Sequence, residues 1–237
     1  LWTVLLGFFM ILVDATIVTV GINTIQHELG GELNQVMWVT SGYLLAYAVP
    51  LLITGRLGDL WGVKHTYVAG LVIFVLASLA CGLAPSLSML IIARVVQGLG
   101  AALLTPQTMA LITQMFPPAH RGAAMGLWGA AAGIASLTGP LAGGVLIELL
   151  SWRWIFLINV PIGLIGLVFA FRYLPTFETH RNKIDYLGVV LSAIGMFLLV
   201  FGIQEGESAG WSGWIWALIA GGVVVLGLFT ACLLYTS

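Results

Sequence analysis

Eight apolar stretches follow one another along this 237-residue chain, and each is long enough to cross a lipid bilayer as a helix. A helix needs about 20 apolar residues to span the hydrocarbon core. The segments between these stretches are short and carry most of the charged residues. We therefore predict membrane-spanning helices over residues 2–21, 38–57, 66–84, 88–110, 122–148, 154–173, 186–204 and 213–234.

The small number of charges supports the membrane class and excludes others. Charged residues make up 7% of the chain, whereas a soluble domain carries about 25%. They are too few to cover a water-exposed surface of this size. The net charge of −1 leaves no basic face for nucleic acid. We expect a lipid bilayer, and no nucleic acid, among the partners.

The distribution of Lys and Arg between the connections predicts the orientation, because basic residues favour cytoplasmic connections. The connections after the second, fourth and sixth stretches hold six basic residues, and the opposite set holds only Arg153. We expect a multi-pass protein of a cell (inner) membrane with a cytoplasmic amino terminus. The six basic residues are Arg56, Lys64, Arg121, Arg172, Arg181 and Lys183.

One longer connection, residues 175–185, separates six predicted spans from a further pair. We predict an all-α membrane protein with a six-helix bundle over residues 1–174, a cytoplasmic connection over 175–185 and two additional transmembrane helices over 186–234. Because residue 1 already lies in an apolar run, we expect the chain to be the front part of a longer protein.

Six tryptophans lie near the predicted outer edges of the spans. Tryptophan is enriched at membrane interfaces, where its ring anchors a protein. We interpret all six as anchors rather than as ligand-binding residues. They are Trp38, Trp152, Trp154, Trp211, Trp214 and Trp216.

Only two charged residues, Asp14 and Arg94, fall well inside predicted spans. Each costs about 2.5–3.5 kcal/mol near a helix centre and therefore needs a reason. At about 1.5 Å per residue both lie some 9–12 Å below the outer edge, so they could share a cavity or pair across it. Gln97 lies one turn after Arg94 on the same helix face. The pair is either a protonatable carboxylate beside an arginine or an ion pair that only fixes packing.

A second group of charges lies between the second and third spans. It consists of Arg56, Asp59 and Lys64, interleaved with Gly55, Gly58 and Gly62. A signal for membrane orientation explains Lys64, but it explains neither the aspartate nor the glycines. A tight turn that docks on neighbouring helix ends, and releases them when the conformation changes, explains more of these residues.

The fifth span carries small residues at four-residue spacing, which mark close helix contacts in membranes. Pro140 removes the backbone hydrogen bond to the Ser136 carbonyl and predicts a bend. Tight packing is one interpretation, and a bend that seals or hinges a pathway is the other. The small residues are Ala131, Ala135, Gly139 and Gly143, with Ser136, Pro140 and Gly144 on the adjoining stripe.

No motif indicates an enzyme, a cofactor or a metal site. The sequence contains neither a Gly-x-Ser-x-Gly motif nor a phosphate-binding Gly-x-x-x-x-Gly-Lys-Ser/Thr motif. The four histidines lie in connections and lack the helical spacing of zinc ligands. Cys81 and Cys232 lie in apolar runs and indicate packing residues.

Four motifs together resemble the major facilitator superfamily, in particular its drug:proton antiporter branch with fourteen transmembrane helices. Residues 13–18 resemble the membrane-embedded aspartate motif of that branch, and residues 55–64 resemble the gating loop of the superfamily. Residues 90–94 with Gln97, Gly98 and 100–102 match the fourth-helix motif. The fifth-helix antiporter motif is matched by Gly126, Gly139, Pro140, Gly143 and Gly144.

The resemblance implies a transporter that exports small hydrophobic or cationic compounds in exchange for protons, without a cofactor. Two alternatives remain open: an exporter or symporter of an endogenous metabolite, and a membrane sensor or scaffold without transport. By the resemblance, Asp14, Arg94 and Gln97 serve proton coupling, and Gly55, Arg56, Asp59, Gly62 and Lys64 form the gating loop.

Overall fold

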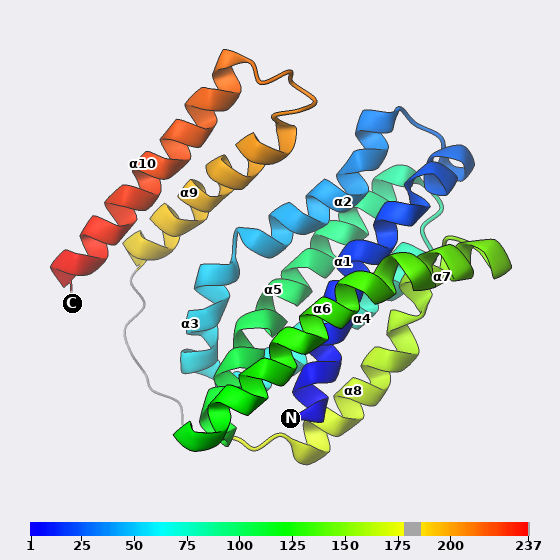
Figure 1. Cartoon of the computed structure of the whole chain (residues 1–237). Helices are drawn as coiled ribbons and strands as arrows, with labels where there is room; N and C mark the ends of the chain where they lie inside the picture. Colours follow the sequence, from blue (N-terminus) through cyan, green and yellow to red (C-terminus); the bar gives the residue numbers. More distant parts are fainter. Residues whose placement is uncertain (178–185, 237) are drawn as a thin grey trace.

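A computed structural model of the chain describes residues 1–177 and 186–236 (Figure 1). Within these described residues, seven helical segments are long and apolar enough to cross a bilayer, and a bent pair makes an eighth if it counts as one span. The predicted all-α membrane fold is confirmed. The helices are α1 (Trp2–Leu29), α2 (Leu33–Ala48), α3 (Leu51–Trp61), α4 (Val63–Gly82), α5 (Leu87–Met115), α6 (Pro118–Leu149), α7 (Trp154–Leu157), α8 (Asn159–Tyr173), α9 (Tyr186–Glu205) and α10 (Gly213–Thr236).

The predicted second span, residues 38–57, is wrong as a single helix. It is divided into α2 and α3, which are bent by 49° relative to each other. Pro50 lies at the break and is the N-cap of α3. Proline has no backbone N–H, and its ring collides with the preceding turn, so a continuous helix is disfavoured at this position.

The helices run up and down between two ends of the molecule. The amino terminus, the end of α3 and the end of α8 lie at one end, which we term the Leu1 end (Figure 1). The turn between α1 and α2 lies at the other, which we term the Gly30 end. In that turn Gly30 and Gly31 have φ angles of 73° and 104°, a region that favours glycine.

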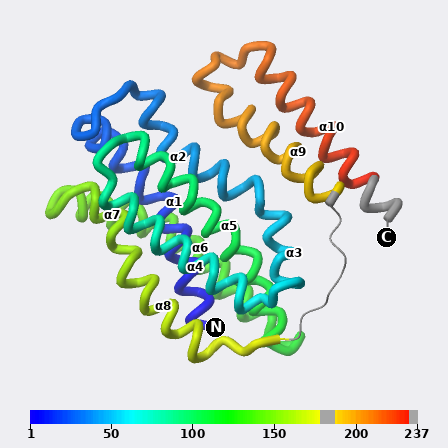
Figure 2. Tube along the Cα trace, turned by 180° about the vertical axis from the view of Figure 1, so that it is seen from behind, coloured from blue at the N-terminus to red at the C-terminus, as the bar shows by residue number. Residues whose placement is uncertain are grey.

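α1 contacts α2, α5, α6, α7 and α8, and α4 packs against α5 and α8. The hairpin of α9 and α10 lies beside α2 and α3 in both views (Figures 1 and 2), and α9 contacts both of them. Residues 178–185, which include most of the predicted connection with Arg181 and Lys183, lie outside the described residues.

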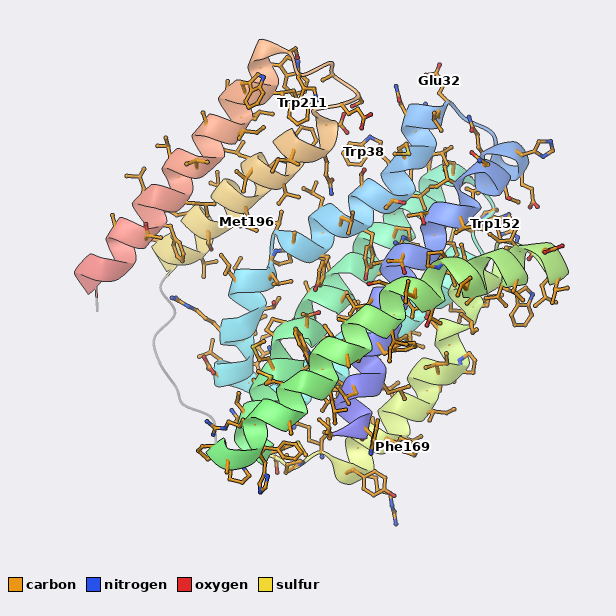
Figure 3. All side chains as sticks on the ribbon, viewed as in Figure 1. Glu32, Trp38, Trp152, Phe169, Met196 and Trp211 are labelled. Carbon is orange, nitrogen blue, oxygen red and sulfur yellow. The ribbon has the colours of Figure 1, made fainter. Side chains whose placement is uncertain are left out.

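The tryptophans do not share one environment. Trp154, Trp211, Trp214 and Trp216 are 43–56% exposed, as interfacial anchors require. Trp38 and Trp211 lie toward the Gly30 end, as does Glu32 (Figure 3).

The prediction that Trp152 is an interfacial anchor is wrong, because its side chain is fully buried. Its indole Nε1 donates a 2.8 Å hydrogen bond to Glu28 Oε2, and the Arg153 guanidinium lies 4.5 Å from its ring centroid. Trp152 therefore joins the end of α1 to the segment before α7.

Candidate functional site

The two charges that the sequence places inside the membrane form an ion pair. Nη1 of Arg94, on α5, donates a 2.5 Å hydrogen bond to Oδ2 of Asp14, on α1. It is the one ion pair found among residues 1–177 and 186–236. The sequence indicated that the two residues lie at similar depth, and in the structure they are in direct contact.

Two side-chain amides complete the ligands of the carboxylate. Gln97 Nε2 and Asn159 Nδ2 donate to Asp14 Oδ1 over 2.9 Å and 2.7 Å. Gln97 lies one turn after Arg94 on α5, whereas Asn159 is the first residue of α8. Asp14 thus ties α1 to two other helices.

Gln97 extends this network to α4. Its Nε2 also donates to Ser78 Oγ at 2.6 Å. Its Oε1 accepts from Arg94 Nη1 at 2.7 Å and from Cys81 Sγ at 3.7 Å. The Gln97 amide therefore has four partners and is held in one orientation.

The guanidinium of Arg94 has further contacts with α2. Its Nε donates a 3.0 Å hydrogen bond to the Val39 carbonyl, and its Cζ lies 4.0 Å from the Tyr43 ring centroid. α5 reaches this position because Gly98 has no side chain, since a Cβ there would meet the Tyr43 carbonyl oxygen at 2.5 Å. Nη2 is buried without a partner in the described structure.

The whole cluster is enclosed. Asp14, Arg94 and Gln97 are 0% exposed, and Asn159 is 2% exposed. In this conformation the pair does not face an open cavity, although the sequence allowed one. Asp14 is therefore closed to solvent in this conformation.

Asn159, Ser78 and Tyr43 are members of the site that sequence reasoning did not select. Asn159 and Ser78 lie in predicted spans, where a polar side chain requires a hydrogen-bond partner. That requirement was a usable signal for both residues. No sequence signal distinguishes Tyr43 from other tyrosines, because its role depends on where the arginine lies.

The predicted gating loop lies at the Leu1 end, away from this cluster. Lys64 Nζ donates hydrogen bonds to the carbonyls of Phe171 (3.2 Å) and Leu174 (2.6 Å), at the end of α8. Gly62 has a φ of 90° and joins α3 to α4. Lys64 therefore attaches the loop to a neighbouring helix end, and the release of this contact in another conformation stays a prediction.

The other charges of the loop do not form an ion-pair network with Lys64 within the described part of the chain. Asp59 is exposed. Arg56 borders a small pocket with Val189 and Ser192 of α9. A Cβ added at Gly55 would lie 3.7 Å from the Cβ of Pro106, on α5.

The predicted small-residue stripe of α6 packs against α1. A Cβ at Gly139 would meet Thr16, and a Cβ at Gly143 would lie 3.0 Å from the Ile17 carbonyl oxygen. Ala135 is buried on the same stripe. This contact lies within one turn of Asp14 along α1.

The second stripe of α6 does not take part in that contact. Pro140 is exposed, and a Cβ at Gly144 or Gly126 would meet nothing within 4 Å. The prediction that Gly144 belongs to the packed face is therefore wrong, because its position on the helix turns it away from α1. α6 continues through Pro140 as one helix, and the predicted bend stays a prediction.

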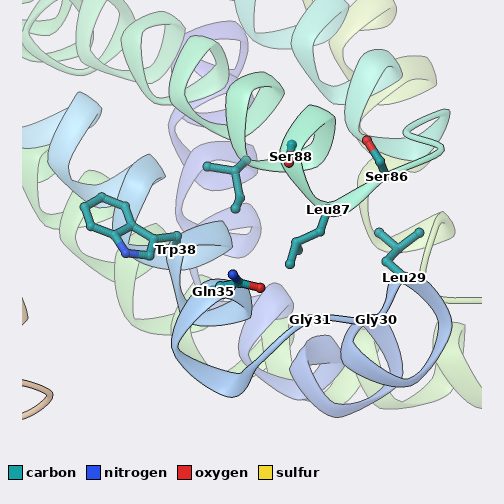
Figure 4. Close-up of a pocket in the computed structure, with 9 residues that line it drawn as sticks. Leu29, Gly30, Gly31, Gln35, Trp38, Ser86, Leu87 and Ser88 are labelled. Carbon is teal, nitrogen blue, oxygen red and sulfur yellow. The ribbon is translucent and has the colours of Figure 1, made fainter.

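A pocket of about 480 Å³ lies at the Gly30 end, between the ends of α1, α2 and α5 (Figure 4). Gly31, Gln35, Ser86 and Leu87 are among its lining residues. None of the residues of the charge cluster lines it, so it does not give access to the pair.

The fold and the site define a multi-pass α-helical membrane protein with a buried, hydrogen-bonded ion pair between its helices. The sequence profile of the Major Facilitator Superfamily matches residues 4–234. The chain belongs to this superfamily, so the predicted resemblance is confirmed.

Curated relatives are transporters and resistance proteins. An uncharacterised MFS-type transporter of Mycobacterium tuberculosis is 53% identical over 229 residues, which are 97% of this chain and 40% of that protein. The tetracenomycin C resistance and export protein of Streptomyces glaucescens is 38% identical, with coverages of 89% and 40%. The methylenomycin A resistance protein of Streptomyces coelicolor is 39% identical, with coverages of 87% and 44%. The chain spans less than half of the length of these relatives.

Solved transporter structures share the fold. A peptide transporter POT in complex with sulfate superposes with a TM-score of 0.68 at 16% identity, over 98% of this chain and 46% of that one. An inward-facing bacterial homologue of the human lysosomal transporter Spinster gives a TM-score of 0.61 at 19% identity, over 94% and 57%. At such identities the likeness concerns the fold alone.

Proposed function

We propose that this chain is part of a secondary active transporter that exports small hydrophobic or cationic compounds in exchange for protons by alternating access. Residues 1–174 form one of its bundles and residues 186–234 an added helix pair. The observation that carries the proposal is the enclosed Asp14–Arg94 pair with its amide ligands. Two relatives named for antibiotic resistance support export as the direction.

The chemistry of the pair suits proton coupling. As an ionised carboxylate, Asp14 accepts hydrogen bonds from residues on α5 and α8. Hydrogen bonds between charged groups are roughly twice as strong as neutral ones. A proton on Asp14 neutralises the carboxylate and weakens its hold on Arg94. The contact of α1 with α5 and α8 thereby depends on the proton.

In the proposed orientation the Leu1 end lies in the cytoplasm of a cell (inner) membrane. Lys64 and Arg121 lie in the first turns of α4 and α6 at this end, and Arg153 lies in the connection before α7 at the Gly30 end. The excess of basic residues on one side follows the rule for cytoplasmic connections.

The test is the replacement Asp14→Asn, which keeps the size of the side chain and removes its titration. Everted vesicles that carry the full-length protein receive a proton gradient, and export of a fluorescent hydrophobic cation is followed across a pH series. We expect Asp14→Asn to abolish proton-driven export. The matched control is Glu207→Gln, which neutralises an exposed carboxylate in the turn before α10 and should export as the wild type does. Proton-driven export that survives Asp14→Asn overturns the proposal.

A further inference from the structure

The three donors to Asp14 differ in how firmly they are held. Arg94 is fixed by the Val39 carbonyl, by Gln97 and by the ring of Tyr43. Gln97 has four hydrogen-bond partners. Asn159 is as buried as its neighbours but, within the described structure, its carboxamide makes a single hydrogen bond, the one to Asp14. It is the donor that can change orientation at least cost.

Protonation of Asp14 changes what its ligands must offer. The carboxylate only accepts hydrogen bonds, whereas the carboxylic acid has an O–H that must donate one. Arginine has no acceptor atom, and the oxygen of Gln97 already accepts from Arg94 and Cys81. The side-chain carbonyl oxygen of Asn159 accepts no hydrogen bond in the described structure. A half-turn about the Cβ–Cγ bond, where asparagine has a broad two-fold preference, would present that oxygen to Asp14.

We propose that Asn159 is the positioning residue that reverses its carboxamide when Asp14 gains a proton. The proton binds to Oδ1 of Asp14, Oδ2 keeps its contact with Arg94, and the new O–H donates to Oδ1 of Asn159. The reversal links the protonation of α1 to the first residue of α8. This inference rests on the proposed function, in which Asp14 carries the proton.

Few other groups near Asp14 compete for this role. The charged or titratable neighbours are Arg94 on α5, Tyr43 on α2 and Cys81 on α4. α7 contains no titratable side chain, and the only ones of α8 are Arg172 and Tyr173 at its far end. The titratable side chains of α6 are His120 and Arg121 in its first turn and Glu148 in its last. Asn159 is thus the ligand through which α8 senses the charge of Asp14.

The position of Asn159 in the fold makes its orientation consequential. α7 ends at Leu157 and α8 begins at Asn159, but Ile158 between them keeps the helical φ and ψ of −61° and −28°, and Trp154–Tyr173 forms one span. Ile158 is the only residue between the two helices. A change in the hydrogen bond of Asn159 therefore acts near the start of the sixth span, within two turns of its first residue, Trp154.

The first experiment compares the pH dependence of proton-driven export by the full-length wild type and by Asn159→Leu, whose side chain branches at the same atom but neither donates nor accepts. Asn159→Leu removes a donor to the ionised carboxylate and an acceptor for the protonated acid. The loss to the ionised form is the larger one, because hydrogen bonds to a charged group are roughly twice as strong as neutral ones, so the profile should move to higher pH by about one pH unit. Asn34→Leu, at the exposed start of α2, is the matched control and should leave the profile unchanged. A profile of Asn159→Leu that overlays the wild type overturns the inference, provided that Asp14→Asn has lost coupling. If Asp14→Asn keeps coupling, it is the proposed function that fails.

The second experiment follows the two side chains directly in the wild-type protein. Infrared difference spectra of the wild-type protein, with asparagine labelled by ¹⁵N, are recorded on acidification. We expect the protonated carboxyl band of Asp14 to appear together with a shift of an asparagine amide band. The Asp14→Asn protein should show neither change. A carboxyl band that appears without any asparagine shift overturns the inference.

Discussion

Arg94 shows how a single charged residue is accommodated among apolar helices. Its guanidinium contacts a carboxylate, an amide oxygen, a backbone carbonyl and an aromatic ring at once. Breaking a buried pair by removal of one partner costs about 3–5 kcal/mol, because a charge is left without compensation. Removing both charges should cost less than the sum of the two single removals, because no charge is then left without a partner. The pair should therefore behave as one unit.

We predict that Arg94→Leu lowers the free energy of unfolding by about 3–5 kcal/mol. In the double variant Asp14→Asn/Arg94→Leu the loss should be smaller than the sum of the two single losses, by about 0.5–3 kcal/mol. Unfolding of the purified proteins in detergent measures all three values. Strictly additive losses would show that the two residues act independently.

The sequence predicted the pair and its ligand Gln97, but not the second amide ligand, Asn159. A charge inside a span is conspicuous because it costs several kcal/mol, and equal depth then suggests a partner. Asn159 carries no charge, so the same reasoning passed over it. Which amide reaches the carboxylate depends on how α8 packs on α1, and this packing results from many apolar contacts that no single residue indicates.

Among the elements, α6 shows how one helix presents two different faces. Gly139 and Gly143 lie against α1, whereas Gly144 lies one position further on and meets nothing within 4 Å. The sequence predicted one small-residue face that included Gly144, but only the stripe of Gly139 and Gly143 is packed. The choice depends on the surface of α1 at Thr16 and Ile17. Between α2 and α3, by contrast, the sequence did contain a signal for the break, Pro50. The continuous apolar run around it led to the prediction of a single helix.

The two neighbouring glycines of α6 allow a matched test of packing. Replacing glycine by alanine in a helix stabilises it by about 0.5–1 kcal/mol when the methyl group has room. We predict this gain for Gly144→Ala. Gly143→Ala should instead destabilise the protein, because its Cβ would lie 2.9 Å from Ile17 Cγ1 and 3.0 Å from the Ile17 carbonyl oxygen. Thermal unfolding in detergent compares the two, and equal shifts for both would contradict the assignment of the packed face.

The contact between the loop after α3 and the end of α8 yields a third prediction. Lys64→Met keeps the aliphatic stem of the side chain but loses two hydrogen bonds from a charged donor. We expect a loss of about 1.5–3 kcal/mol in the free energy of unfolding. Lys64→Arg should recover part of that loss, since it keeps a charged donor. The same unfolding assay applies, and a wild-type value for Lys64→Met would show that the contact contributes no stability.

At the scale of the whole molecule, one charge of the loop has no structural task in this conformation. Asp59 is exposed and has neither an ion pair nor a hydrogen bond within the described residues. Its neighbours in the same loop, by contrast, contact α8 and α9. An alternating-access transporter adopts at least one further conformation, and we infer that Asp59 has its partner there.

We therefore predict that Asp59→Asn changes stability by no more than about 0.5 kcal/mol, as is usual for an exposed position. Turnover in the full-length protein should nevertheless fall, while the affinity for the exported compound stays near that of the wild type. Binding titration and vesicle export separate the two quantities. A fall in affinity in step with export would contradict a role in conformational change.

The helices of this bundle differ in length more than a lipid bilayer can match. α4 has 20 residues and α6 has 32, so their lengths are about 30 Å and about 48 Å. A hydrocarbon core of about 30 Å fits the first, and the second must tilt or thicken the surrounding lipid. Acyl-chain length therefore acts on α6 more than on α4. Because α6 packs against α1 beside Asp14, a change in the thickness of the host membrane that tilts α6 also acts on the helix that holds the buried carboxylate.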